Sequence, residues 1–374
     1  MAGLVRPKNP CLDKLVMPIA GPIAPVNPTT PITQPVQREI LTDFTPDPEK
    51  SYPNQLWEVK ILQICYFPLT VSGLQLDINI TGDVGSALST VRAHVATETA
   101  TLIDALEEGC HETIAYRVMG RIEVHEGYPL TNGTKYRASG YNPPLVDYEK
   151  MMLRFDIADW VAQGINQVWV WGYHGEKVTL WESTMSSTFG NISNSDRNKE
   201  LPIIAGKTYT VFNYNYGRGA ADAMEDHCHQ LEQLLNHVDG RQSTPESEWP
   251  NLLFWGKFVG SNKTHRLVAN NGVYRCGWSH YAPNSIEDYD WHNPRVVTSD
   301  FYDWRPEGGG ATQQISCANF SCDDDGGMAW KIAWMRAIPR ENNGLTFNGK
   351  ALTNWWSFVG EFDTAMSEQR KLIE

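Results

Sequence analysis

Residues 208–238 read "TYTVFNYNYGRGAADAMEDHCHQLEQLLNHV" and join a strand-like stretch to a helix-like one. The β-branched and aromatic residues of 208–216 are typical of a buried strand. The turn residues Gly217-Arg218-Gly219 follow, and from 220 to 238 apolar residues recur at helical spacing. A buried strand that leads directly into a helix is typical of the α/β class.

The same alternation is present upstream of this stretch. Strand patterns cover 56–69, 113–126 and 166–174, and helical patterns cover 86–110 and 148–165. This order predicts an α/β fold with a mixed, substantially parallel sheet flanked by helices, in a single large domain over 54–374. After residue 240 the alternation fades, so we expect a long loop-rich C-terminal half.

The first 53 residues differ in composition from the rest. They hold 11 of the 22 prolines, which are incompatible with a helix or a central strand. We therefore expect residues 1–53 to form a proline-rich extended arm or linker, through which the protein could self-associate.

The charge balance excludes some classes of partner. The chain of 374 residues has a formal net charge of −13, with 31 basic and 44 acidic residues, which disfavours nucleic acid. No apolar stretch reaches the roughly 18 residues that a membrane-spanning helix needs, so we expect no membrane insertion.

Two features favour a secreted or extracellular protein. Cys317 and Cys322 flank a short polar turn and could form a disulfide, although the seven cysteines are too few for a disulfide scaffold. Acceptor sequences for N-glycosylation occur at Asn79, Asn132, Asn191, Asn262 and Asn319.

Helix 220–238 carries two stripes of side chains at about 100° per residue. The core-facing stripe is apolar and comprises Met224, Cys228, Leu231, Leu235 and Val238. Glu225, His229 and Glu232 form the second stripe, which flanks the core face, as at the border of a groove. His227 points elsewhere.

The second stripe is a candidate metal site. His229 and Glu232 form an HxxE pair, and His280 from the distant aromatic loop is the candidate third ligand. Three such ligands bind Zn²⁺ in catalytic sites and leave one position open for water. The alternative is a solvated helix face with weak contacts between residues four apart.

Further candidates follow the ends of predicted strands, because ligands of open α/β sheets bind beyond the carboxyl ends of the strands. Tyr216 and Arg218 follow strand 208–216, and Arg218 could bind a carboxylate or a phosphate. Glu182 follows strand 166–174 and is a candidate acid or base. The alternatives are a tight turn with Arg218 in solvent and an exposed loop glutamate. The Gly217-Arg218-Gly219 turn lacks the residues of a nucleotide-binding loop, so we assign no cofactor-binding residues.

The loop "HYAPNSIEDYDWHN" at 280–293 adds Asp288, Asp290 and Trp291 as candidate substrate-binding residues. It could bring a metal ligand and an acid to the helix. It could equally be a turn-rich loop whose aspartates cap backbone amides.

Four blocks of the chain together resemble a known family. They are "WES-T-M" preceded by "VWVWG", then "VFNYNYGRG", "MEDHCHQLE" and "HYAPNSIEDYDW". In this order they are similar to a largely uncharacterised family of predicted secreted proteins, mostly bacterial. Its members have a strand like "GFNYER", a helix with E-x-x-x-H-x-x-E and a loop like "HYxPNSxxDYDW".

The resemblance covers roughly residues 57–305, and it is the combination of blocks that is specific. It implies functional roles for Glu182, Glu225, His229, Glu232, His280, Asp288 and Asp290. This chain departs from the family at Gly217, where a glutamate is expected, and at Cys228, where a glycine is expected. The resemblance supports a choice of residues and implies no particular reaction.

These observations favour a secreted metal-dependent hydrolase that acts on a peptide or a carbohydrate. His229, Glu232 and His280 would bind Zn²⁺, Glu225 or Glu182 would be the general base, and Arg218 would orient an anionic substrate group. The substrate would also contact Tyr216, Asp288, Asp290 and Trp291.

Two alternatives remain at this stage. One is a metal-free glycoside hydrolase with carboxylates drawn from Glu182, Glu225, Glu232 and Asp290. The other is a non-enzymatic secreted binding or structural protein.

Overall fold

The computed structural model describes residues 39–41, 44–135, 144–174, 178–195, 201–322 and 326–374. Within these residues a six-stranded sheet has the order β1-β3-β2-β6-β8-β7. Its strands are β1 (Glu39–Leu41), β2 (Trp57–Tyr66), β3 (Ile114–Val124), β6 (Gln167–Gly172), β7 (Ser183–Ser186) and β8 (Tyr209–Asn215). The four inner strands are parallel, whereas β1 and β7 pair antiparallel at the two edges.

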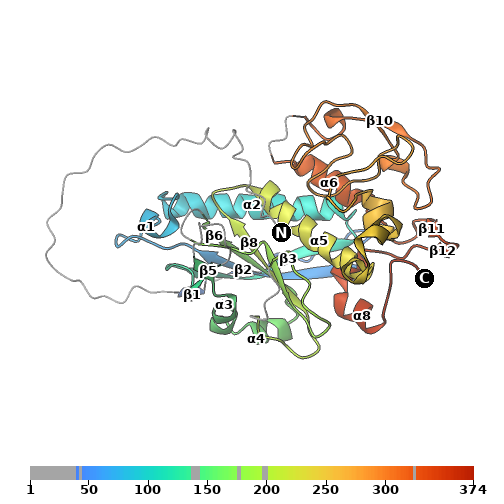
Figure 1. Ribbon diagram of the computed structural model, residues 1–374. Helices are drawn as coiled ribbons and strands as arrows, with labels where there is room; N and C mark the ends of the chain where they lie inside the picture. The colour runs from blue at the N-terminus through green and yellow to red at the C-terminus, as the bar shows by residue number, and fades with distance from the viewer. Residues whose placement is uncertain (1–38, 42–43, 136–143, 175–177, 196–200, 323–325) are drawn as a thin grey trace.

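Helices cover both faces of this sheet (Figure 1). Helices α2 (Leu88–Gly109) and α5 (Ala220–Val238) lie on one face, and α3 (Tyr148–Arg154) and α4 (Ile157–Ala162) lie on the other. Strands β6 and β8 are buried along almost their whole length, as expected for parallel strands covered on both sides. The predicted α/β fold with a mixed, mostly parallel sheet is confirmed.

The helix expected over 148–165 is two short helices. They meet at Asp156, whose φ of 50° is in the left-handed region. An α-helix cannot continue through that conformation, so α3 ends before it and α4 begins after it. The strand and helix of 208–238 form as predicted, as β8 and α5.

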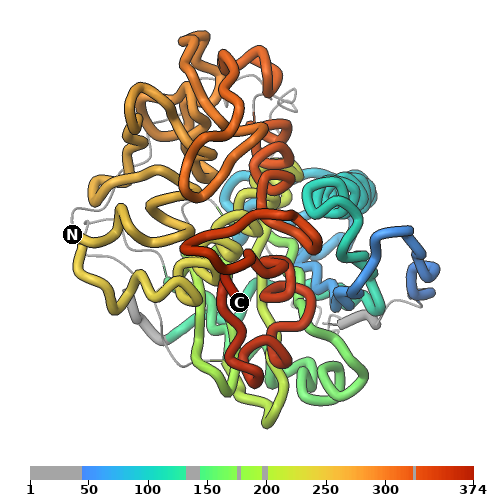
Figure 2. Tube along the Cα trace, turned by 90° about the vertical axis from the view of Figure 1, so that its right-hand side faces the viewer, coloured from blue at the N-terminus to red at the C-terminus, as the bar shows by residue number. Residues whose placement is uncertain are grey.

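The part of the chain after α5 contains short elements joined by loops. In Figure 2 its orange part lies at the top of the view, and its red C-terminal part lies back at the centre and below it. Helix α6 (Met328–Ala337) contacts both α2 and α5. The other elements after α5 are η2 (Arg241–Ser243), η3 (Glu246–Asn251), η4 (Leu253–Val259), β9 (Val297–Ser299), η5 (Phe301–Asp303), β10 (Gln313–Ile315), η6 (Cys317–Asn319), β11 (Thr346–Phe347), β12 (Lys350–Ala351), α7 (Ser357–Gly360) and α8 (Phe362–Ser367). Before α5 lie α1 (Ile78–Thr81), β4 (Leu130–Lys135) and β5 (Pro144–Val146).

Most of the proline-rich arm expected over 1–53 lies outside the described residues. Its last part is attached to the sheet and to α2, because β1 pairs with β3 and the side chains of Lys50 and Tyr52 both bind Glu107 of α2. The Tyr52 hydroxyl donates to Glu107 Oε2 at 2.7 Å. Self-association through the arm stays a prediction.

Packed tyrosines fill the space beyond the carboxyl ends of the parallel strands, where we expected the site. The rings of Tyr66 and Tyr173 each lie 4.6 Å from the ring of Tyr128. Tyr216 packs against Phe67, with its ring centre 5.9 Å away. Buried aromatic rings therefore occupy this end of the sheet, and Tyr216 is part of their packing.

Cys317 and Cys322 form a disulfide, as the sequence indicated. A disulfide is compatible with an extracellular protein. Four other cysteines of the described chain, Cys65, Cys110, Cys228 and Cys276, are buried free thiols. Among the described helices, none combines the length and the apolar composition needed to cross a membrane.

Candidate metal centre

Helix α5 is buried on the sheet side and on the opposite side. The ring of His227 stacks on Phe212 of β8 with ring centres 4.0 Å apart, so His227 faces the sheet. His229 is two residues further on, about 200° around the helix, and faces away from the sheet. The row of Glu225, His229 and Glu232 is therefore buried opposite the sheet and does not border an open groove. Residues of the C-terminal half, among them Ser279, Tyr289 and Lys331, pack over this row.

A tight turn after η4 brings His280 to this row. Gly277 has a φ of 73°, and a Cβ at this position would lie 2.1 Å from the carbonyl oxygen of Tyr281. Helix α6 holds the turn, because the indole nitrogens of Trp330 and Trp334 donate to the carbonyls of Ser279 and Gly277 at 3.0 and 2.9 Å. The aromatic residues near the C-terminus thus position a histidine of the candidate site.

Three side chains converge in the geometry of a metal site. Glu225 Oε1 lies 3.5 Å from His229 Nε2 and 3.3 Å from His280 Nε2. One ligand atom from each of the three residues lies within 4.8 Å of the other two. Around an ion that binds its ligands tetrahedrally at about 2.0–2.1 Å, neighbouring ligand atoms are about 3.3 Å apart. Glu225, His229 and His280 could therefore hold a metal ion.

Each of the two histidines also has a carboxylate at its other ring nitrogen. Glu232 Oε2 lies 3.2 Å from His229 Nδ1, and Asp288 Oδ1 lies 3.2 Å from His280 Nδ1. In metal sites such a carboxylate fixes the tautomer and the orientation of the histidine. The structure therefore places Glu225 in the position of a ligand, whereas Glu232, which we had expected to be a ligand, supports His229.

Glu232 is itself fixed by the backbone, because its Oε1 accepts a hydrogen bond from the Ser279 amide at 2.7 Å. The Ser279 hydroxyl lies 3.2 Å from His229 Nδ1. Ser279 directly precedes His280 in the turn, so its contacts with Glu232 and His229 connect this turn to α5.

Lys331 of α6 is a member of the site that the sequence did not single out. Its ammonium lies 3.1 Å from Glu225 Oε2 and donates to the carbonyl oxygens of Ala221 and Gly326 at 2.8 and 2.9 Å. The side chain is 1% exposed. A single charged residue within the apolar run "MAWKIAW" was the signal that could have identified it.

Tyr289 was also missed. Its hydroxyl donates to Glu225 Oε1 at 3.1 Å, and its ring centre lies 4.1 Å from that of His280. The residue has a φ of 61°, which directs the side chain of this loop back toward the cluster. The loop that carries Asp288 therefore also supplies a hydrogen-bond donor to Glu225.

The charges of the cluster are strongly coupled. Burial alone would raise the pKa of Glu225, but the Lys331 ammonium and hydrogen bonds to His229 and His280 hold it well below its usual value. Burial would lower the pKa of His229, but hydrogen bonds to Glu225 and Glu232 raise it well above its usual value. Without a metal ion, the raised pKa of His229 favours its protonated form, which offsets part of the carboxylate charge.

Glu182, the residue before β7, acts on His229 through its charge. It is partly buried, it helps to raise the pKa of His229, and it accepts a hydrogen bond from the Asn194 side chain. Burial first, and Glu182 second, raise the pKa of the neighbouring Asp226 well above its usual value. Glu182 is therefore a carboxylate whose charge acts on His229, and it is not one of the three candidate ligands.

The remaining predicted site residues have other contacts. Arg218 forms an ion pair with Asp222 at 3.2 Å at the start of α5. Asp290 accepts hydrogen bonds from the Ile286 amide and the Asn293 side chain, at 2.9 and 2.7 Å, and so shapes its own loop. Trp291 is buried, and its ring centre lies 5.4 Å from the Lys331 ammonium. Trp291 thus borders the cluster, whereas Arg218, Tyr216 and Asp290 serve local packing and turns.

A scan against protein-family models and searches of curated proteins and of solved structures found no match to this chain. The family resemblance of the four sequence blocks stays an expectation.

Proposed function

We propose that the protein is a secreted metal-dependent hydrolase whose metal ion is bound by Glu225, His229 and His280. The observation that carries this proposal is the convergence of these three side chains, each histidine backed by a carboxylate at Nδ1. Two imidazoles and one carboxylate are a common ligand set of catalytic zinc. Zn²⁺ is therefore the ion we expect.

Zinc held by three side chains lowers the pKa of a coordinated water to about 7, which supplies a nucleophile for hydrolysis. We assign Glu182 as the general base, because it is partly buried, its charge acts on His229, and it is not one of the three ligands. Tyr289 and Lys331 hold the Glu225 carboxylate in position. Whether the substrate is a peptide or a carbohydrate is part of the test.

Secretion is part of the proposal and is supported by two observations. The chain has a disulfide, which oxidising compartments favour. Two of the asparagines in glycosylation sequences, Asn79 and Asn319, are exposed.

Metal content tests the site directly. Protein purified without added ions should contain about one equivalent of divalent metal by elemental analysis, or take up one equivalent of Zn²⁺ in titration. His229→Ala and His280→Ala should lose this equivalent, whereas the control His292→Ala, an exposed histidine of the same loop, should retain it. Folded wild-type protein that neither contains nor takes up a metal ion would end the proposal.

Activity tests the assignment of the base. Fluorogenic peptides and glycosides should be screened with the zinc-loaded protein, and Glu182→Gln should then lower kcat by about 10²-fold or more while one equivalent of metal stays bound. Unchanged kcat in Glu182→Gln would remove Glu182 from the mechanism.

A second candidate function is a structural metal site, and the burial of the cluster favours it. The side chains of Glu225 and His229 are 7% exposed, and that of His280 is 13% exposed. An ion at this place would tie α5 to the turn of His280. In this case chelation would lower the melting temperature, and no substrate of the screen would be hydrolysed.

The metal-free glycoside hydrolase finds less support. Two histidines lie among the carboxylates of the cluster. Tryptophans that could have formed a sugar platform are fully buried in the core, namely Trp169, Trp171, Trp181, Trp255, Trp330, Trp334, Trp355 and Trp356.

A further inference from the structure

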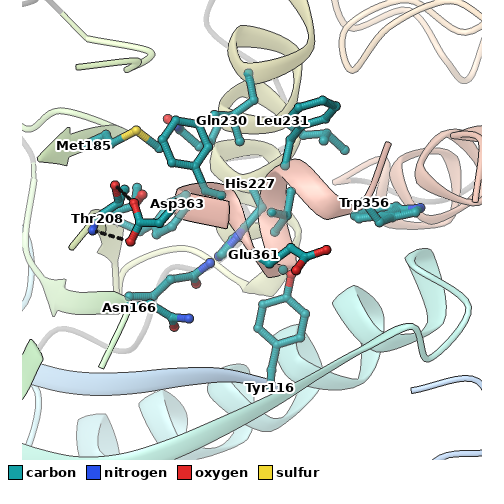
Figure 3. A pocket seen from close by; sticks show the side chains of 18 of the residues that line it. Tyr116, Asn166, Met185, Thr208, His227, Gln230, Leu231, Trp356, Glu361 and Asp363 are labelled. Carbon is teal, nitrogen blue, oxygen red and sulfur yellow. Dashed lines mark hydrogen bonds between the residues drawn. The ribbon is translucent and has the colours of Figure 1, made fainter. Parts of the chain in front are cut away.

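A cavity of about 280 Å³ lies on the side of α5 that faces the sheet (Figure 3). It is partly open and is lined by the first residues of β6 and β8, by Tyr116 of β3, by α5 and by the segment 356–364. His227 and Leu231 line it, whereas Glu225 and His229 point to the other side of the same helix. The cavity is therefore separate from the candidate metal centre.

Two carboxamides in its wall have a fixed orientation. Asn166 Oδ1 accepts the Lys60 amide at 2.9 Å, and Gln167 Oε1 accepts the Trp169 indole at 2.9 Å. These bonds use the oxygen of each side chain and leave the –NH₂ groups as donors. Both residues line the cavity, so its wall offers hydrogen bonds to acceptor atoms.

Tyr116 supplies a third polar group. The residue is 1% exposed, and its side chain points up into the cavity in Figure 3. In the part of the chain that the structure describes, its hydroxyl has no hydrogen-bond partner in the protein. A buried hydroxyl that faces a cavity without a protein partner is a hydrogen-bonding group available to a ligand.

His227 also points into the cavity and is held there by a hydrogen bond between its Nε2 and the Tyr214 hydroxyl, 2.7 Å long. Stacking on Phe212 fixes the plane of the ring. The imidazole therefore adds a rigid polar group next to the donors.

Three charged residues line the cavity, namely the exposed Lys207 and the acidic Glu361 and Asp363. Glu361 forms an ion pair with Arg370, and Asp363 accepts the Thr208 amide at 3.0 Å. The ion pair of Glu361 and the opposite charges of Asp363 and Lys207 leave the lining close to neutral, so it favours neither an anionic nor a cationic ligand. The rest of the lining combines the polar residues Thr208, Thr210, Gln230 and Thr364 with apolar ones, among them the aromatic residues Phe212, Trp356, Phe358 and Phe362.

We infer that this cavity binds a small uncharged aromatic molecule that presents a carbonyl or hydroxyl oxygen to Tyr116, Asn166 and Gln167. Aromatic side chains suit a flat apolar body, and two fixed –NH₂ donors suit an oxygen acceptor. The volume is near the lower end of the range of about 300–1,000 Å³ that is usual for ligand pockets, so the ligand has one or two rings.

Two probes that differ only in the group carrying the oxygen acceptor test whether the cavity prefers an uncharged ligand. Full-length protein should bind 4-methoxyacetophenone in the millimolar range by ligand-observed NMR titration, and 4-methoxybenzoate, which has a carboxylate in place of the ketone, should bind at least tenfold more weakly. Binding of neither probe, or equal binding of both, would overturn the inference.

The variant Tyr116→Phe tests the place of binding. It should lower the affinity for 4-methoxyacetophenone about five- to tenfold, which corresponds to the loss of one neutral hydrogen bond. Its melting temperature should stay unchanged, because the hydroxyl has no protein partner. The control Tyr302→Phe, at an exposed tyrosine, should bind the probe as the wild type does. Unchanged affinity in Tyr116→Phe would place the probe elsewhere and contradict the inference.

Discussion

Lys331 places a buried ammonium beside a buried carboxylate. Its partner Glu225 has an acidic pKa only because the ammonium and the two histidines compensate for burial. Removing one member of such a pair leaves the other charge uncompensated, which costs about 3–5 kcal/mol.

Lys331→Met should therefore lower the free energy of unfolding by about 3–5 kcal/mol in urea titrations. The exposed Lys350 of β12 is the control, and Lys350→Met should stay within about 0.5 kcal/mol of the wild type. The double variant Glu225→Gln/Lys331→Met should recover part of the loss, because no charge is left unpaired. A double variant as unstable as the sum of both single variants would contradict the pairing.

His227 makes stability depend on pH at the cavity. Burial lowers its pKa to about 3, below the usual 6.5. Since the folded-state value is the lower one, the neutral ring contributes stability above pH 6.5, and this contribution is lost as pH falls from 6.5 toward 3. The loss is at most about 1.4 kcal/mol for each pH unit.

We therefore expect wild-type protein to lose up to about 2.7 kcal/mol more than His227→Gln when urea unfolding at pH 6.5 is compared with unfolding at pH 4.5. The control His292→Gln changes an exposed histidine and should follow the wild type. Identical pH dependence of wild type and His227→Gln would show that His227 is not buried as a neutral ring.

At the level of elements, strand β6 ends against the tyrosines beyond the sheet. A Cβ at Gly172, its last residue, would lie 1.7 Å from the Tyr128 hydroxyl oxygen. Only glycine lets the strand and this ring approach so closely. The end of β6 and the packed tyrosines are therefore in direct contact, so a change in one displaces the other.

Gly172→Ala should lower the free energy of unfolding by about 1–3 kcal/mol, since the ring or the strand must move. Gly85 is the matched control, because a Cβ there would only reach ordinary contact with Ile78 at 3.5 Å. Thermal unfolding of both variants checks this, and equal melting temperatures would contradict the proposed contact.

Helix α5 also shows how far prediction from the sequence reached. Its bounds follow from apolar spacing and from the glycines before it, and both were read correctly. The surroundings of its polar residues did not follow, because Glu225, His229 and Glu232 were assigned to a groove border and are buried. Helical periodicity shows which residues share a side of a helix, but it does not show what later segments of the chain cover that side.

The sequence predicted those residues of the candidate site that lie on α5 or in the loop 280–293. The sequence predicts His280 as a partner of His229, and their ring centres lie 4.5 Å apart in the structure. Lys331 could not be paired with Glu225, because the sequence gives no contact information for residues 106 positions apart. The different positions of Glu225 and Glu232 relative to the histidines depend on the directions of their side chains, which the sequence does not give.

For the whole molecule, the connection between α5 and α6 is a long-range contact that closes a loop of 106 positions. Closing a loop of this length has a large entropic cost. Its contacts are therefore expected to form late in folding, after the local contacts and the contacts of the sheet. The Glu225–Lys331 pair should therefore be absent from the rate-limiting transition state of folding.

This order has a kinetic consequence for the lifetime of the native protein. Lys331→Met should accelerate unfolding by roughly a hundredfold or more and leave the refolding rate nearly unchanged, because the lost interaction is formed only after the barrier. Stopped-flow experiments across a range of urea concentrations measure both rates. A refolding rate slowed by the same factor would place the pair in the folding nucleus. If only the unfolding rate increases, the buried Lys331 is a determinant of the slow unfolding, and hence of the long lifetime, of the native state.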